Sequence, residues 1–303
     1  MIVRPRLNWL RMLLVWRGSV LPGIAVQLLI TTGIAILVTV LHGRLFHWKV
    51  PLNFVPFSLI GLTLAIFLGF RNSTSYARFW EARTLWGVVL NDSRSFLRQA
   101  LTLTNAPANV GVVSSRLIAF VHALRHQLRR SNPGADFDRL LNAEDRARVR
   151  KARFAPAVLL LLMAEWLREQ RTAGQVEPAL VQVMEGSICR LTDALGGCER
   201  IASTPIPFTY AVIIHRTISL YCLLLPFGLV DAIGPMTPVG VAFIAYTFFA
   251  LDALAAQIED PFGLEPNDLA LDAMSQMIES TLREMLGETL PEADVVPVPY
   301  FQT

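Results

Sequence analysis

The chain has 303 residues; 53% of them are hydrophobic, only 17% are charged, and the mean hydropathy is +0.46. Soluble globular proteins carry about 25% charged residues, so this composition excludes a disordered chain, a coiled coil and a typical soluble enzyme. It predicts a membrane protein with a substantial part in water.

Two apolar segments in the first quarter of the chain predict membrane-spanning helices. Residues 18–41 and 52–70 contain no Asp, Glu, Lys or Arg, and each is long enough to cross the hydrocarbon core, which takes roughly 20 helical residues. The first segment is longer than the apolar core of a signal peptide, has no small-residue cleavage site after it, and is followed at once by another span. We therefore expect both segments to remain as transmembrane helices.

The second span carries large apolar residues on one helical face. Leu62, Ile66 and Phe70 are spaced at i, i+4 and i+8, which places them above one another along a helix. The residue before each of them is glycine or alanine, and such a stripe lets helices approach closely. In an isolated span the large stripe would be packing or lipid-facing surface. Around a symmetry axis it would form stacked apolar rings, which can gate or filter ions by excluding water.

Residues 71–205 are predicted to be helical throughout. Apolar residues recur there at spacings of three and four, as in amphipathic helices, and turn-type sequences such as SNPG at 131–134 interrupt the pattern. No Pro/Gly-rich linker separates this region from the spans, so we expect a helical extension of the membrane bundle and a single domain over residues 1–303. The predicted helical stretches cover residues 85–104, 112–130, 156–171 and 177–195.

Two further spans are predicted at residues 206–230 and 232–251. The first of them contains His215 and Arg216, and a charge inside a span has to face protein, water or the interface. Pro226 would kink this helix, because proline removes a backbone donor. Four spans put both termini on one side of the membrane. Arginines flank the first span and follow the second, so the positive-inside rule places the termini and residues 71–205 in the cytoplasm.

The remaining residues, 252–303, form an acidic cytosolic tail. The chain before residue 206 has a net charge of +13, whereas the rest has a net charge of −10. We expect the acidic part to pack on the basic middle segment, in the same chain or in a neighbouring one. The alternative is two separately solvated faces.

The sequence contains little that would support an enzyme. It has no GxxxxGK[ST] phosphate-binding loop and no GxSxG nucleophile elbow. His122 and His126 have the i, i+4 spacing of zinc ligands, but no third ligand lies nearby and we favour a polar helix face. The three cysteines fit packing thiols in a reducing compartment. Arginines alternate with acidic residues in the middle segment, so we expect no nucleic-acid binding.

Several short blocks, spread over nearly the whole chain, resemble the bacterial branch of the bestrophins in their order and their residues. Any one block alone would be weak, but together they are specific. The blocks are WRGS at 16–19, FLGFRN at 67–72, Tyr76 with Arg78, EAR at 81–83, WG at 86–87, GCERI at 197–201, TPIPF at 204–208 and DPFG at 260–263.

The resemblance implies an all-α homopentameric ion channel of the bacterial inner membrane, with four spans per subunit and one central pore. Its partners would be identical subunits, membrane lipid and the permeant ions. The family's neck residues map onto Leu62, Ile66 and Phe70. A lower cytosolic aperture maps onto Ala179, with Leu180 or Val176 as alternatives. Alanine is smaller than the aliphatic residue expected there, so this aperture would be wide and its role in selectivity is in doubt.

Animal members of the family bind calcium after the last span, although the resemblance implies no required cofactor. The corresponding oxygen donors here are Gln257, Asp260, Glu265 and Asp268, and calcium takes six to eight oxygen ligands. The dense acidic run of animal members is thinned in this sequence by Leu264 and its neighbours. The alternative is an acidic turn that pairs with cytosolic arginines.

The resemblance favours chloride as the conducted ion, and the alternative is a channel of the same fold for sodium or potassium. Arg71, or helix N-termini aimed at the pore axis, could favour anions. Asp252, Glu259 and Asp260 could favour cations if they face the pore. A transporter with alternating access is less favoured, because such proteins usually contain an internal repeat and none is visible. A membrane scaffold without transport is the third hypothesis.

Overall fold

The computed structural model describes residues 8–13, 15–16, 18–45, 48–49, 54–105 and 109–289. The chain folds into two compact units. The apolar unit comprises Arg4–Phe79 and Pro205–Asp260, and the charged unit comprises Met1–Val3, Trp80–Thr204 and Pro261–Thr303. One helix, α3 (Phe54–Leu103), belongs to both units, because its residues up to Phe79 fall in the first and the rest fall in the second.

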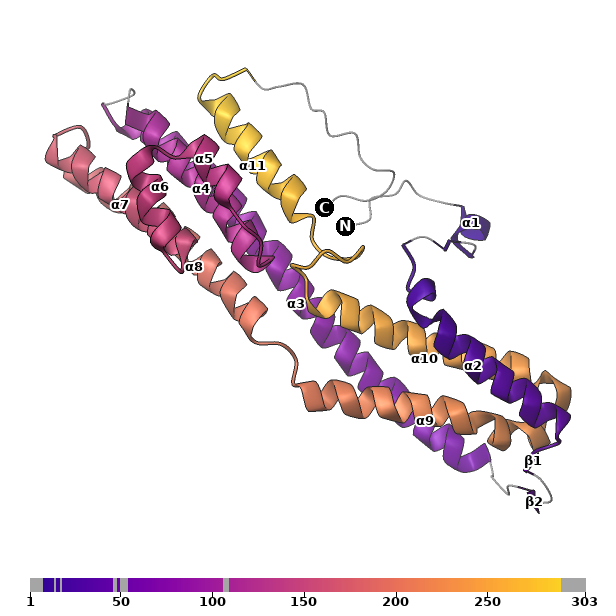
Figure 1. Cartoon of the computed structure of the whole chain (residues 1–303). Helices are drawn as coiled ribbons and strands as arrows, with labels where there is room; N and C mark the ends of the chain where they lie inside the picture. Colours follow the sequence, from indigo (N-terminus) through magenta and orange to yellow (C-terminus); the bar gives the residue numbers. More distant parts are fainter. Residues whose placement is uncertain are drawn as a thin grey trace. The chain divides into compact units, whose positions relative to one another are not determined.

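The apolar unit is built mainly from long helices, with one short hairpin whose two strands have two residues each (Figure 1). Proline occupies the first turn of α2 and of α10, where a missing N–H costs nothing and the fixed φ suits a helix. Pro226 lies within α9, but the helix continues past it to Ile233. The elements are α1 (Trp9–Leu13), α2 (Leu21–Val40), β1 (Arg44–Leu45), β2 (Trp48–Lys49), the first half of α3, α9 (Phe208–Ile233), η2 (Gly234–Met236) and α10 (Thr237–Glu259).

The core of the apolar unit packs α10 against α2 and α9, and seats one face of α3 on them. Tyr221 is central: its ring centroid lies 6.1 Å from that of Phe57 and 5.5 Å from that of Phe248. Gly61 permits this packing, because a Cβ there would lie 2.7 Å from the Tyr221 hydroxyl oxygen. A Cβ at Gly69 would meet no described atom within 4 Å. A neighbouring helix therefore lies close to the small stripe at Gly61, whereas the space beside Gly69 is open in the described structure.

Among the described residues, three helical stretches are long and apolar enough to cross a bilayer: Leu21–Val40, Val55–Leu103 and Phe208–Glu259. The third has 52 residues, more than twice the length that one crossing requires. The 3₁₀ turn η2 divides it into α9 and α10, with Gly234 in the left-handed region at φ 53°. Each of the four segments that composition predicted as spans overlaps one of these stretches.

The charged unit is a helical assembly in which α4 packs on α7, α7 on α8, and α11 on α4 (Figure 1). In α4, 11 of the 19 residues are buried. The edge contact of Phe96 with Trp166 (ring centroids 6.4 Å apart) joins α3 to α7. The helices are the second half of α3, α4 (Val110–Leu128), α5 (Gly134–Leu140), α6 (Ala143–Lys151), α7 (Ala155–Thr172), α8 (Pro178–Ser203) and α11 (Leu271–Met285). The four helical stretches predicted for residues 71–205 are confirmed, and α5, α6 and α11 are additions to them.

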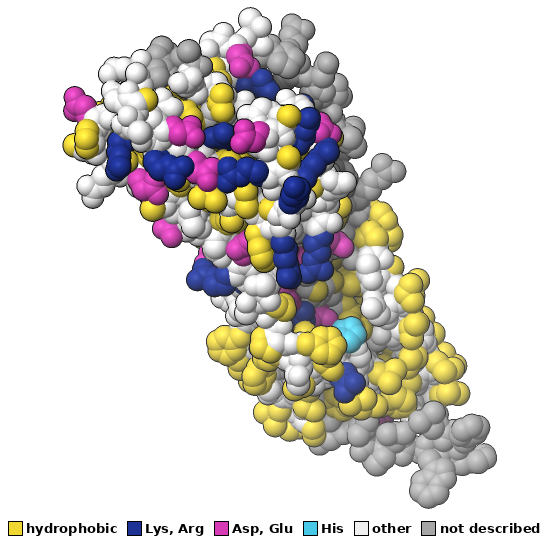
Figure 2. Space-filling model, turned by 60° about the vertical axis from the view of Figure 1, so that its left-hand side comes forward, with side chains coloured by type: hydrophobic (Ala, Val, Ile, Leu, Met, Phe, Trp, Pro, Cys, Tyr) yellow, Lys and Arg dark blue, Asp and Glu magenta, His cyan; other side chains and the backbone are white. Residues whose placement is uncertain are grey.

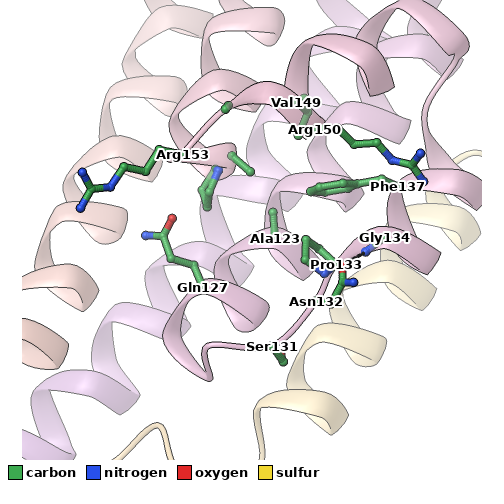
Figure 3. A pocket seen from close by; sticks show the side chains of 13 residues that line it. Ala123, Gln127, Ser131, Asn132, Pro133, Gly134, Phe137, Val149, Arg150 and Arg153 are labelled. Carbon is green, nitrogen blue, oxygen red and sulfur yellow. Dashed lines mark hydrogen bonds between the residues drawn. The ribbon is translucent and has the colours of Figure 1, made fainter.

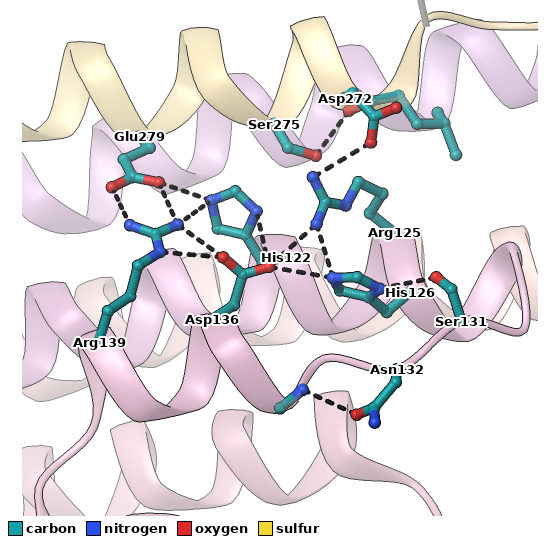
Figure 4. A network of polar contacts seen from close by, with 12 residues as sticks. His122, Arg125, His126, Ser131, Asn132, Asp136, Arg139, Asp272, Ser275 and Glu279 are labelled. Atoms are coloured by element: carbon teal, nitrogen blue, oxygen red, sulfur yellow. Dashed lines mark hydrogen bonds and ion pairs between the residues drawn. The ribbon is translucent and has the colours of Figure 1, made fainter.

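The acidic tail packs on the basic middle segment within one chain, as predicted (Figure 4). Asp272 of α11 pairs with Arg125 at 3.1 Å and with Arg129 at 2.5 Å. Further along α11, Glu279 contacts Arg139 at 2.5 Å and His122 at 2.6 Å. Burial alone would raise the pKa of Glu279, but these hydrogen bonds outweigh burial and hold that pKa well below its ordinary value.

Candidate functional site

The large apolar stripe of the second span lies on the exposed face of α3. Leu62, Ile66 and Phe70 are 62%, 51% and 63% exposed, whereas Leu64 and Leu68 are 4% and 1% exposed. Residues two positions apart in a helix are rotated by about 200° about its axis. The exposed Leu62 and the buried Leu64 therefore lie on opposite sides of the helix. The buried side belongs to the core of the apolar unit. The exposed side is a continuous apolar surface that nothing described within the apolar unit covers.

A buried charged cluster follows the stripe immediately. The Arg71 side chain is 5% exposed, donates through Nη1 to Asp252 of α10, and has Nη2 3.6 Å from Glu259 Oε2. On the other side, His215 Nδ1 of α9 lies 3.0 Å from Asp252 Oδ2. One guanidinium therefore faces two carboxylates at the end of the stripe. Arg71 and Asp252 therefore compensate each other's charge, and Glu259 adds a second carboxylate.

The same stretch of α3 is tied to α10 by two further contacts. Asn72 Nδ2 donates to the carbonyl oxygens of Leu68 at 2.9 Å and Leu251 at 3.3 Å, and Arg78 Nε donates to that of Glu259 at 3.2 Å. Arg71, Asn72 and Arg78, which span two turns of α3, thus form hydrogen bonds or ion pairs with the end of α10. Their effect is to fix the rotation of α3, and with it the direction in which the stripe faces.

Residues predicted for the lower aperture lie at the start of α8. Ala179 is exposed in its first turn, Leu180 is half-buried, and Val176 is buried inside the charged unit. Glu177 caps this helix in an extended conformation without a side-chain hydrogen bond. Ala179 and Leu180 reach the surface, so both stay candidates, whereas the burial of Val176 removes it from any surface ring.

The four predicted calcium ligands fall in different units: Gln257 and Asp260 in the apolar unit, Glu265 and Asp268 in the charged unit. Asp268 is buried, and its Oδ2 accepts a hydrogen bond of 2.7 Å from the Glu265 backbone N–H, so it builds the turn that precedes α11. Within the described ranges, no group of three or more His, Cys, Asp or Glu side chains is placed to hold a metal ion. Oxygen donors suit calcium, but one of the four already has a structural task, and calcium binding stays a prediction.

The two histidines of α4 lie on a polar helix face, which the chain itself covers. His122 is 2% exposed between Glu279 and Asp136, and His126 Nε2 contacts Asp136 at 3.0 Å (Figure 4). Burial is the largest cause of a lowered pKa for His126. All three cysteines are free. Cys198 and Cys222 are buried, and burial raises the pKa of Cys198 to about 12, as expected of an inert packing thiol. Cys189 is exposed, so the prediction of a packing thiol is wrong for this residue.

Comparison with known proteins gives consistent relatives. The family model described as bacterial/fungal bestrophin protein matches residues 1–284. A voltage-dependent anion channel-forming protein of Ralstonia nicotianae is 50% identical over 291 residues, 95% of each chain. The voltage-dependent anion channel-forming protein YneE of Escherichia coli K12 is 42% identical over 302 residues, covering 100% of this chain and 99% of that one.

The fold has a similar counterpart among crystal structures. A bacterial bestrophin homolog from Klebsiella pneumoniae superposes with a TM-score of 0.86 at 40% sequence identity. The match covers 88% of this chain and 100% of that one.

Proposed function

Because this chain belongs to the bacterial and fungal bestrophin family, whose members are channels and not enzymes, we propose that it is a subunit of a membrane channel for small monovalent anions. Its pore neck is formed by Leu62, Ile66 and Phe70. The names of its relatives as anion channel-forming proteins support the sign of the conducted ion.

One observation carries the neck: a helix able to cross a membrane exposes three large apolar side chains on one face while burying the leucines on the opposite face. Exposed apolar surface costs about 25 cal/mol per Å² in water, so this face belongs against lipid or in a narrow constriction. Five copies around one axis would stack it into three apolar rings. Such rings gate by excluding water. Neighbouring charged groups then determine whether anions or cations pass.

The membrane arrangement follows from the same helices. Four crossings are proposed, by α2, the first half of α3, α9 and α10, with both termini and the charged unit in the cytoplasm of a bacterial cell and the spans in its inner membrane. The positive charge of residues 71–205 supports this orientation. A second constriction lies at Ala179 and is wide because alanine is small. Calcium, bound by Gln257, Asp260, Glu265 and Asp268, would be a regulator and not a required cofactor.

A cation channel for sodium or potassium is the second candidate, and one observation favours it. At the end of the neck Arg71 faces two carboxylates, Asp252 and Glu259, so these three side chains together carry one net negative charge. A lone exposed arginine would have attracted anions; this cluster does not.

The test is a planar bilayer measurement with the purified oligomer. Under a KCl gradient, a reversal potential near the chloride equilibrium potential supports the anion channel, and one near the potassium potential supports the second candidate. Truncating the neck (Leu62→Ala, Ile66→Ala, Phe70→Ala) is expected to raise conductance about ten-fold, equivalent to ~1.4 kcal/mol of barrier.

The matched control truncates one residue of the same helix that lines the apolar groove between α3 and α9 and lies off the stripe, Phe67→Ala. It should leave conductance unchanged. Unchanged currents in the neck variant, with the oligomer intact, would contradict the neck assignment.

A further inference from the structure

The charged unit contains a cavity of about 500 Å³ between the end of α4, α5, the end of α6 and the start of α7 (Figure 3). Phe137, Val149 and Pro156 give it an apolar wall. Gln127 and Arg153 lie together on the opposite side from Phe137 (Figure 3). Its size is that of a small-molecule site, and an apolar wall with a few polar groups is the usual composition of such sites.

A second hollow of about 370 Å³ shares Gln127 and Arg153 with the first and adds Arg130 and Phe154. The two hollows therefore meet at one polar junction. Gln127 is held there, because its Nε2 donates to Glu199 Oε1 at 2.6 Å. Arg153 is held as well, with its guanidinium 5.4 Å from the centre of the Phe154 ring. The junction is thus organised by contacts within the chain.

The cations at this junction differ from most arginines of the charged unit. The face shown in Figure 2 carries basic and acidic side chains side by side, and pairs such as Arg116–Asp145 and Arg150–Asp138 compensate one another. Arg130 and Arg153 form no ion pair with any residue in the described part of the chain. Two exposed arginines without an ion-pair partner in the described residues consequently border one connected hollow, which one carboxylate, that of Glu199, also lines.

Both arginines occupy positions that local structure disfavours for them. Arg130 follows α4 with φ 52°, and Ser131 N–H closes the turn onto the His126 carbonyl at 2.9 Å. That left-handed position after a helix favours glycine or asparagine. Arg153 stands just before α7, whose N-cap Phe154 makes no side-chain hydrogen bond and whose first turn has no acidic residue. A cation there faces the positive end of a helix.

We propose that this double hollow binds a small organic anion. An oxyanion head, carboxylate or phosphate, would lie between Arg130 and Arg153 beside the start of α7, and a compact apolar body would lie against Phe137, Val149 and Pro156. Such a ligand would relieve the charge at both disfavoured positions, and local rules are most often broken at functional sites. The proposal does not depend on the sign of the conducted ion.

The experiment titrates the full-length detergent-solubilised oligomer with phenyl phosphate, benzoate, inorganic phosphate and benzyl alcohol by calorimetry. We expect saturable binding of at least one of the two aromatic anions, weaker binding of inorganic phosphate and none of benzyl alcohol. The arms distinguish a phosphate from a carboxylate head. No saturable binding of either aromatic anion, or equal binding of benzyl alcohol, would overturn the proposal.

Two variants test the site itself. Arg130→Gly removes a cation but supplies the residue that the left-handed position favours, so its Tm should equal or exceed that of the parent while the Kd rises about ten-fold, as for loss of a hydrogen bond to a charged group. Arg153→Gln should weaken binding similarly. Arg171→Gln, an exposed arginine at the far end of α7, is the matched control and should leave the Kd unchanged. An unchanged Kd in Arg130→Gly, or an equal change in Arg171→Gln, would overturn the site.

Discussion

The two units use charge in opposite ways. In the apolar unit a small cluster, Arg71 with Asp252, Glu259 and His215, lies between helices whose other contacts are largely apolar. In the charged unit, ion pairs are numerous and several are exposed, as with Arg148 and Glu165. A buried pair is expensive to break because the remaining charge stays desolvated, whereas an exposed pair is screened by water. Breaking the buried ion pair of the apolar unit should therefore destabilise the protein far more than breaking an exposed ion pair of the charged unit.

The largest effect is expected from Arg71→Met. This change leaves the Asp252 carboxylate buried without its cation, and breaking a buried pair costs about 3–5 kcal/mol. Denaturant titration of the detergent-solubilised protein measures the loss. The double variant Arg71→Met, Asp252→Leu should recover at least half of it. If the single variant were as stable as the parent, the cluster would not contribute to the stability of the fold.

Next comes Glu279→Ala in the charged unit. It removes hydrogen bonds from His122, Arg139 and Arg283 at a cost of about 2–3 kcal/mol, and it should loosen α11 in particular. Hydrogen exchange should accelerate over residues 271–285 and not over α7. Uniform acceleration in both helices would argue against a local role.

Acid should produce the same loosening without mutation. The folded-state pKa of Glu279 and that of Asp136 are lowered, so their contribution is fully present above the ordinary carboxyl range near pH 4. It is lost as pH falls through the lower folded-state values. Exchange of α11 amides, corrected for intrinsic rate, should therefore stay slow at pH 5 and accelerate below about pH 4. A midpoint at pH 6 would contradict this.

A smaller effect is expected from the glycines of α3. Gly61→Ala would bring a Cβ to 2.7 Å from the Tyr221 hydroxyl, and such overpacking costs about 1–3 kcal/mol. Gly69→Ala meets no described atom within 4 Å and should be neutral or slightly stabilising, since alanine favours helices. Thermal unfolding of the two variants separates them; equal Tm values would show that Tyr221 can move aside.

The smallest effect is expected at the exposed pair. Arg148→Gln separates it from Glu165, and because both side chains are in water we expect no measurable change in Tm. A loss of stability as large as that of Arg71→Met would contradict the expected difference between buried and exposed ion pairs.

Much of the fold could be predicted because it follows from local periodicity and composition. The helices of residues 71–205, the apolar spans and the exposed stripe at Leu62, Ile66 and Phe70 depend on spacing alone. The attraction between the acidic tail and the basic middle followed from counting charges. The helix α11 was missed, although Leu271, Ile278 and Leu282 lie on one face and are buried, because the tail was considered only for its charge.

Features that depend on distant partners could not be predicted. Arg71 was a candidate for attracting anions, but Asp252, 181 residues away, holds it. The polar face of His122 was predicted but its burial was not, because Glu279, the partner on α11, is 157 residues away in the chain. The short polar helices α5 and α6 have few apolar residues to give a period, and tertiary contacts stabilise them.

The direction of the stripe is the central claim, and thiol accessibility tests it most directly. In a Cys189→Ser background, which removes the exposed native thiol and leaves the two buried ones, Ile66→Cys and Leu64→Cys are compared in a planar bilayer. A charged, water-soluble methanethiosulfonate reagent should change the current through Ile66→Cys channels and leave Leu64→Cys channels unaffected. Unmodified currents in Ile66→Cys, or equal modification of both variants, would contradict a water-accessible neck on this face of α3.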